Sequence, residues 1–161
     1  MKLPYQIDER YKTKVAYFSM EFAIHQALKI YSGGLGFLAG SHMRSAYDLQ
    51  QNVVGVGILW SYGYYDQERA EDRTMAVHFR RKFYSFLEET GITVEVMINN
   101  HPIKVKAMLL PANAFHSAPI YLLTTDIEDN DFLAKTITHK LYDAHHETRI
   151  ATDIDFSSFG P

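Results

Sequence analysis

The stretch "YSGGLGFLAGSHMRSAYDLQQNVVGVGIL", residues 31–59, decides the fold expected of this chain. After its paired glycines, apolar residues recur with helical spacing, which predicts an amphipathic helix over about residues 35–50. The β-branched run at 53–59 predicts a buried strand, and "KVAYFSM" at 14–20 predicts another before the glycines. Strand, glycine loop, helix and strand together predict a βαβ unit with parallel strands.

The predicted helix carries an apolar stripe that is expected to face the core. Its members fall at positions three, four and seven residues apart, the spacing of one helical face. They are Leu35, Leu38, Ala39, His42, Ala46 and Leu49. Gly40 lies inside the helix, so alanine there is expected to be neutral or mildly stabilising.

The rest of the chain predicts further strands and helices. Residues 77–91 predict a helix ended by glycine, whereas 61–74 show no periodicity. Alternating segments on either side of "NNHP" predict a hairpin, and "PIYLLTTD" at 119–126 predicts a buried strand. Residues 129–142 predict a helix, and 145–151 look helical as well. The expected fold class is α/β.

Composition restricts the classes of function. The chain has 161 residues, 47% of them hydrophobic, and a net charge of -3 with no basic stripe, so nucleic acid is not an expected partner. It has no cysteine, which excludes disulfides and thiol chemistry. It lacks an apolar run of roughly 18 residues and a basic-then-apolar leader, so a cytoplasmic protein without membrane segments is expected.

The glycine loop could bind an anion or serve only for tight packing. Glycines let a ligand approach the backbone closely, and the first N–H groups of a helix together with its dipole favour phosphate. "SGGLG" is neither the dinucleotide fingerprint nor a P-loop, because the acidic residue of the former and the Lys-Ser/Thr of the latter are missing.

Four ordered segments carry a family resemblance. "SMEF", "SGGLGFLAG", "VGVGIL" and "YGYYDQ" resemble the start of the α-glucan (glycogen and maltodextrin) phosphorylases, especially the short bacterial type. Similarity continues through "YLLTTDIEDND" and "THKLYDAHHETRIA" to Ala151. The resemblance implies that residues 1–151 are an incomplete N-terminal domain and that 152–161 form a divergent or truncated tail.

The resemblance also implies a fold and a reaction. The family has the GT-B fold of two Rossmann-like domains and phosphorolyses α-1,4-glucan or maltodextrin reversibly with inorganic phosphate, releasing glucose 1-phosphate. Its cofactor, pyridoxal 5'-phosphate, is bound mainly by a second domain that has no counterpart in this sequence. The chain alone is therefore expected to be inactive, and its uncovered apolar surfaces are expected to make it self-associate as a homo-oligomer.

By the same resemblance, Gly33 and Gly34 lie against the reacting phosphate and the cofactor phosphate. Leu35 is expected to add its amide to this cluster and its side chain to the core. Glu21, in "SMEF", is expected on the substrate side of the site, where ligand sites of α/β proteins collect. His25, on the same loop, is taken as an ordinary surface or hydrogen-bonded histidine, and no catalytic residue is assigned within the chain.

Other interpretations remain open. A GT-B glycogen or starch synthase has a similar glycine loop but usually a lysine just before it, where this chain has Ile30-Tyr31-Ser32. A non-catalytic glucan-binding domain could use the tyrosines of "WSYGYYDQ", which are as well explained by stacking on sugars as by core or interdomain packing. One further cluster has no metal-ligand spacing and is interpreted as a solvated face. Its members are His139, Asp143, His145, His146 and Glu147.

Overall fold

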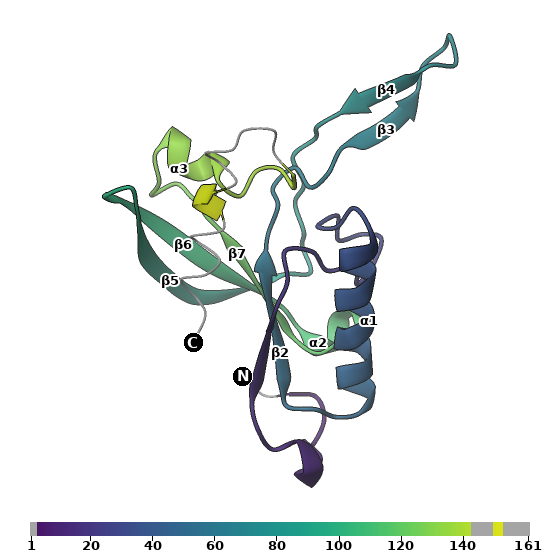
Figure 1. Ribbon diagram of the computed structural model, residues 1–161, viewed down its shortest axis with the longest axis vertical. Coiled ribbons are helices and arrows are strands. Elements are labelled where there is room, and N and C mark those ends of the chain that lie inside the picture. The colour runs from purple at the N-terminus through teal and green to yellow at the C-terminus, as the bar shows by residue number, and fades with distance from the viewer. Residues whose placement is uncertain (1–2, 143–149, 153–161) are drawn as a thin grey trace.

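A computed structural model of the chain describes residues 3–142 and 150–152 (Figure 1). A five-stranded sheet has the strand order β1-β2-β7-β6-β5, and a separate hairpin pairs β3 with β4. The strands are β1 (Val15–Phe18), β2 (Val53–Ile58), β3 (Asp66–Arg69), β4 (Met75–His78), β5 (Glu88–Ile98), β6 (His101–Leu110) and β7 (Ile120–Thr124). The helices are the 3-10 turn η1 (Glu9–Tyr11), α1 (Gly34–Asp48), α2 (Ala112–Phe115) and α3 (Phe132–Thr136).

The predicted βαβ unit is confirmed. β1 pairs with β2 in parallel, and β2 pairs with β7 in parallel. β6 then joins antiparallel to β7 and to β5, which makes the sheet mixed and the fold α/β. In Figure 1, α1 lies along one side of β2, and the β3–β4 hairpin projects away from the body. No helix within the described residues is long and apolar enough to span a membrane.

The long loop between β1 and α1 forms an inner part of the core. Four of its side chains are almost completely buried, although its sequence has no clean period. They are Phe22, Ile24, Leu28 and Ile30. A glycine of β2 makes room for one of these side chains. A Cβ at Gly57 would lie 2.7 Å from the Phe22 ring, so glycine leaves the space that the ring fills.

The predicted inner face of α1 is largely wrong. The buried residues of α1 are Gly36, Ala39, Gly40, Met43 and Ala46. Ala39 and Ala46 were expected there, but Leu35, Leu38, His42 and Leu49 are exposed. Gly36 and Gly40 are buried because the preceding loop lies directly on the helix backbone at these two positions, which leaves no room for leucine there.

The expectation for Gly40 is wrong for the same reason. A Cβ at Gly40 would lie 2.3 Å from the carbonyl oxygen and 2.8 Å from the carbonyl carbon of Ala23. Both atoms belong to backbone, which cannot rotate away as a side chain does. Alanine at this position therefore cannot be accommodated without moving the loop or the helix.

The helix predicted over residues 77–91 is also wrong. Strand β4 extends to His78, an irregular segment follows, and β5 begins at Glu88. Glu88 lies opposite Leu109 of β6, so pairing across the sheet overrides the local pattern. Gly91 has φ +71 and lies where the β5–β6 register shifts, which makes it part of a bulge instead of a helix end. The β3–β4 hairpin was not predicted at all.

The remaining predicted elements are confirmed with changed lengths. The β5–β6 hairpin turns at Asn99 and Asn100, which have φ of 51 and 61, the left-handed values that a tight hairpin turn requires. β7 is the expected strand at 120–124. α3 is capped by Asp131, whose side chain accepts a hydrogen bond from the Ala134 N–H, but it ends at Thr136, well before residue 142. The helix expected at 145–151 and the tail fall mostly outside the described residues.

Candidate functional site

The residue before α1, Gly33, is hydrogen-bonded to Glu21, three residues after the carboxyl end of β1, and ligand sites of α/β sheets form at such strand ends. Gly33 occupies the N-cap position in an extended conformation and offers no side chain to cap the helix. The first N–H groups of a helix have no acceptor within it. Any partner for them must therefore come from another segment or from a ligand.

Glu21 supplies part of that partnership from a buried position. Its side chain is only 1% exposed, and its Oε2 accepts hydrogen bonds from the N–H groups of Ser32 at 2.8 Å and Gly33 at 3.2 Å. Its Oε1 accepts a hydrogen bond from the hydroxyl of Tyr142. Both carboxylate oxygens thus hold the chain in place, and the negative charge lies at the positive end of the helix dipole.

The N–H groups beyond Gly33 belong to Gly34 and Leu35, at the start of the helix. A Cβ added at Gly33 or at Gly34 would meet no atom of another described residue within 4 Å, so the described part of the chain leaves the space beside these two glycines open. The Leu35 side chain is 45% exposed, so its expected place in the core is wrong. The structure thus brings together Gly33 and Gly34, the first turn of α1 and the buried carboxylate of Glu21.

Several side chains fix the loop that leads into this helix. The indole N–H of Trp60 donates to the Met20 carbonyl at 2.9 Å, and Arg44 donates to the Ile24 carbonyl. The Tyr84 hydroxyl accepts the Lys29 N–H at 3.1 Å, and burial raises the pKa of that hydroxyl, so it stays protonated at neutral pH. The loop is therefore ordered before any ligand arrives, which lowers the entropic cost of binding.

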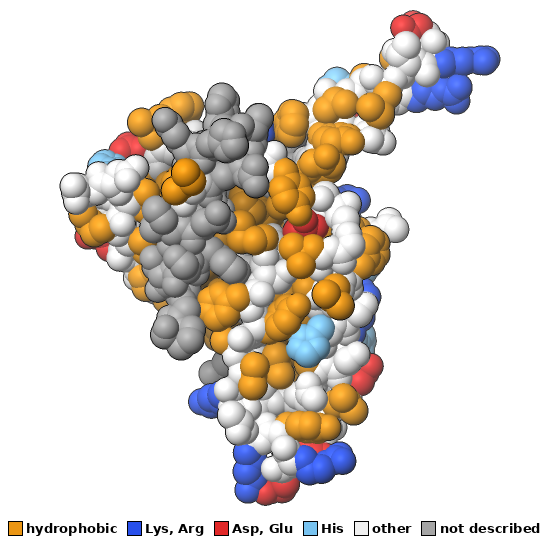
Figure 2. Space-filling view, in the orientation of Figure 1, with side chains coloured by type: hydrophobic (Ala, Val, Ile, Leu, Met, Phe, Trp, Pro, Cys, Tyr) orange, Lys and Arg blue, Asp and Glu red, His pale blue; other side chains and the backbone are white. Residues whose placement is uncertain are grey.

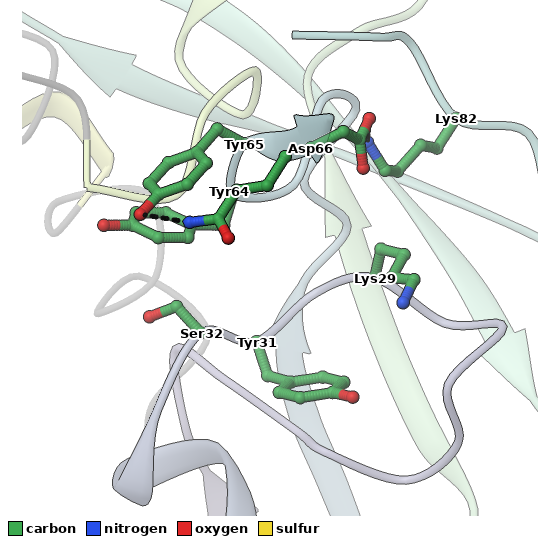
Figure 3. Close-up of a pocket in the computed structure, with 8 residues that line it drawn as sticks. Lys29, Tyr31, Ser32, Tyr64, Tyr65, Asp66 and Lys82 are labelled. Carbon is green, nitrogen blue, oxygen red and sulfur yellow. Dashed lines mark hydrogen bonds and ion pairs between the residues drawn. The ribbon is translucent and has the colours of Figure 1, made fainter. Parts of the chain in front are cut away.

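A pocket of about 520 Å³ adjoins this loop (Figure 3). Figure 3 shows Tyr64 and Tyr65 on one side of it and Tyr31 and Ser32 on the other. We call it the tyrosine pocket; its lining residues are Lys29, Tyr31, Ser32, Tyr64, Tyr65, Asp66, Gln67 and Lys82. The sequence indicated Tyr64 and Tyr65 but gave no reason to group them with residues 29–32 or with Lys82.

Gly63 joins the two sides of the tyrosine pocket. A Cβ at Gly63 would lie 2.3 Å from the Lys29 carbonyl oxygen, and its φ is +63. Only glycine allows this conformation together with so close a contact between two backbones. The segment that carries Tyr64 and Tyr65 is thereby held directly against the loop that carries Tyr31.

Two other polar groups near the site have structural partners. The His25 ring stacks on Phe115 with centroids 4.3 Å apart and accepts the Ala27 N–H at 3.1 Å, as its interpretation as an ordinary histidine predicts. Asp126, at the carboxyl end of β7, accepts a hydrogen bond from the Ser61 hydroxyl at 2.7 Å and pairs with Arg81 at 2.6 Å. These bonds connect the segments that follow β2 and β7, and Asp126 forms an ion pair within the protein.

The histidine and acidic cluster can be followed only in part. His139 lies 3.7 Å from the Asp126 carboxylate, and residues 143–149, which hold the other members, are outside the described residues. Within residues 3–142 and 150–152, no group of three or more His, Asp or Glu side chains is placed to hold a metal ion.

Comparison with known proteins confirms the resemblance to glycogen and maltodextrin phosphorylases. Over 88% of the chain, the sequence is 33% identical to a glycogen phosphorylase of Mycobacterium tuberculosis. Over 90% of the chain, it is 31% identical to a maltodextrin phosphorylase of Thermococcus litoralis. An uncharacterised protein of Methanocaldococcus jannaschii is more similar, at 58% identity over 86% of the chain.

These relatives are much longer than the aligned region. The chain spans 17% of the Mycobacterium phosphorylase, 18% of the Thermococcus phosphorylase and 27% of the Methanocaldococcus protein. No family model matches the chain. The similarity therefore concerns one part of a phosphorylase, and the activity of the whole enzymes does not pass to this chain by identity alone.

Proposed function

We propose that this chain is the N-terminal part of an α-glucan phosphorylase and that it forms part of the first Rossmann-like domain of a GT-B fold. The reaction is the reversible phosphorolysis of α-1,4-glucan or maltodextrin by inorganic phosphate, which releases glucose 1-phosphate. The observation that carries the proposal is the start of α1: two glycines with open space above them, held in place by a buried glutamate, in a chain similar to phosphorylases.

The site residues have separate roles in this proposal. The N–H groups of Gly34 and Leu35 donate to a phosphate oxygen, and the α1 dipole adds to the attraction. Glu21 acts on the substrate side through the loop, because its carboxylate fixes Ser32 and Gly33 and so sets the direction of the next N–H groups. Donors fixed in advance stabilise developing charge without reorganisation during the reaction.

The cofactor implied by the resemblance, pyridoxal 5'-phosphate, fits this part of the chain only through its phosphate. The space beside Gly33 and Gly34, which the described residues leave open, and the first N–H groups of α1 suit a phosphate group. When bound, the cofactor phosphate supplies a proton-transfer group for the substrate phosphate. This chain's contribution is to hold the anions and to orient them, and no residue of it is assigned to the aldehyde end of the cofactor.

A titration of the chain with inorganic phosphate tests the anion site. We expect the amide resonances of Gly34 and Leu35 to shift in two-dimensional NMR spectra at millimolar phosphate. In the Gly34→Ala variant a methyl group occupies the open space, so phosphate binding should fall although no contact of the fold is lost. The matched control is Ser41→Ala, an exposed position two turns further along α1. Equal phosphate binding by wild type and Gly34→Ala would refute the proposed site.

Activity gives the second test. With phosphate, maltoheptaose and pyridoxal 5'-phosphate, the 161-residue chain should release no glucose 1-phosphate, because the phosphorylases it resembles are several times longer. Measurable turnover by the chain alone would show that it carries the whole catalytic site. It would overturn the proposal that the chain is only one part of the enzyme.

A further inference from the structure

We propose that the β3–β4 hairpin is a docking arm for a different protein, and that this partner presents carboxylates among apolar side chains. The inference goes beyond the proposed function, because it assigns an interaction to a part of the chain that the phosphate site does not use. We call the surface involved the arm face; it is made by Gln67, Arg69, Arg73, Met75, Val77 and Phe79.

Apolar side chains make up much of the arm face. Gln67 lies opposite Val77 and Arg69 opposite Met75, so these four residues share one face, because side chains alternate along a strand. Met75, Val77 and the following Phe79 are all exposed. A hairpin of two strands is only marginally stable in water by itself, and Figure 1 shows this one projecting from the body. Contact with another surface would bury these apolar side chains and stabilise the arm.

Two arginines give the arm face its charge. Arg69 and Arg73 line one hollow of about 360 Å³, and within residues 3–142 and 150–152 neither forms an ion pair with a carboxylate. Glu68 also borders the hollow, but its carboxylate pairs with Arg80 and lies 3.5 Å from His78, both on the opposite face. The opposite face therefore matches its own charges, whereas the arm face offers two guanidinium groups to a partner.

The acidic residues of the turn are set apart from this hollow. Neither Glu71 nor Asp72 lines it. Asp72 accepts hydrogen bonds from the N–H of Thr74 at 2.9 Å and from its hydroxyl at 2.6 Å, which fixes the turn. Figure 2 shows acidic side chains at the end of the arm and basic side chains to one side of it. The arm thus sorts its charges by position, although their sum is small.

These features determine the chemistry of the partner. Arginine, methionine and aromatic side chains are enriched at protein interfaces, and a guanidinium that loses water in an apolar interface needs a carboxylate. In a twofold contact between two arms the same patch meets itself, so the arginines of both copies would come together. Because like charges in one interface are unfavourable, the partner is a different protein and not a second copy of this chain.

Selection of peptides on the 161-residue chain tests the docking arm. A random heptapeptide library displayed on phage should yield binders rich in Asp, Glu and apolar residues. As a synthetic peptide, the best binder should bind the Arg69→Gln/Arg73→Gln variant roughly tenfold more weakly than wild type, since arginines at an interface often carry much of the binding energy. Its affinity for wild type should fall with added salt. The matched control is Arg80→Gln, which removes a charge from the opposite face of the same hairpin and should bind as wild type does.

Three outcomes would overturn the docking arm. Selected peptides without carboxylates, or equal binding of the best peptide by wild type and the double variant, would show that the arginines do not recognise a partner. Tighter binding of single-stranded poly(U) than of the peptide, lost in the double variant, would assign the arginines to nucleic acid. Self-association of wild type that Val77→Ser abolishes in sedimentation experiments would assign the arm face to a second copy.

Discussion

Alanine at Gly40 should destabilise the chain, whereas alanine at Gly34 should not, although both glycines belong to α1. The new Cβ at Gly40 would meet the Ala23 carbonyl oxygen at 2.3 Å and the Ala23 nitrogen at 3.3 Å. The loop cannot retreat easily, because the Ala23 N–H is bonded to the Gly36 carbonyl at 2.9 Å and Arg44 holds the Ile24 carbonyl. At Gly34 the new methyl group would meet no atom of another residue within 4 Å in the part of the chain that the structure describes.

The expected size follows from two opposing effects. A helix interior gains about 1 kcal/mol when glycine becomes alanine. Overpacking a close contact costs typically 1–3 kcal/mol, and a clash with fixed backbone belongs at the upper end or above it. The net loss at Gly40 is therefore about 2 kcal/mol, which lowers the melting temperature of a chain of this size by roughly 4–8 °C.

Urea and thermal unfolding followed by circular dichroism measure the difference directly. Gly34→Ala should unfold within about 0.5 kcal/mol of wild type, as expected for a surface change that touches nothing. The reasoning is refuted if Gly40→Ala is as stable as wild type, because the loop would then not lie on the helix backbone as described.

Three further predictions concern other parts of the structure. Glu21→Ala should lower the free energy of unfolding by about 2–3 kcal/mol, because the N–H groups of Ser32 and Gly33 and the hydroxyl of Tyr142 lose a buried, charged acceptor; an unchanged urea midpoint would contradict this. The N–H of Ala134 and then His101 lower the pKa of Asp131 below 3.8, so the extra stability of wild type over Asp131→Asn should be present above that pH and disappear as the pH falls through the lowered pKa; a pH-independent difference in unfolding would count against it. Phe37 and Leu38 are 61% and 66% exposed, so the double change to serine should reduce self-association in sedimentation experiments, and equal association of both proteins would exclude this face.

Exposed apolar side chains are also found beyond α1. Figure 2 shows hydrophobic side chains along the projecting hairpin and on the face of the body below it. Met75 and Val77 of β4 are 61% and 44% exposed, and Phe79 just after it is 47% exposed. Exposed apolar patches are typical of surfaces that pack against another domain or another protein. The wrong prediction that Leu35 and Leu38 face the core of this chain is thus explained: they are apolar without being covered by the described residues.

The sequence predicted the central βαβ unit because each of its elements has a strong local pattern. It could not predict which side of α1 is buried. The preceding loop contacts the helix backbone at Gly36 and Gly40, and a hydrophobicity pattern does not reveal a contact between backbones. It failed at residues 77–91 because the pairing of β5 with β6 outweighs a weak local helix pattern. Long-range backbone contacts decide both cases.

The same limit applies to the candidate site. The glycine loop was located correctly, since paired glycines before a helix are visible in any single sequence. The role of Glu21 as acceptor for Ser32 and Gly33 was not, and neither was its bond with Tyr142, 121 residues away. The sequence offered no reason to single out Gly63. Its close contact with the Lys29 carbonyl holds the two sides of the tyrosine pocket together.

The position of Glu21 bears on how tightly this chain alone can bind phosphate. Two N–H donors at about 1.5 kcal/mol each and about 1 kcal/mol from the helix dipole amount to roughly 4 kcal/mol, a Kd of about 1 mM. The buried carboxylate of Glu21 uses part of the same dipole and repels a second anion, so the affinity should lie at or below this value and fall with added salt. Tighter phosphate binding is therefore expected to need cations in addition to the N–H groups of α1. Micromolar phosphate binding by the chain alone would refute this affinity and would point to a cation close to the start of α1.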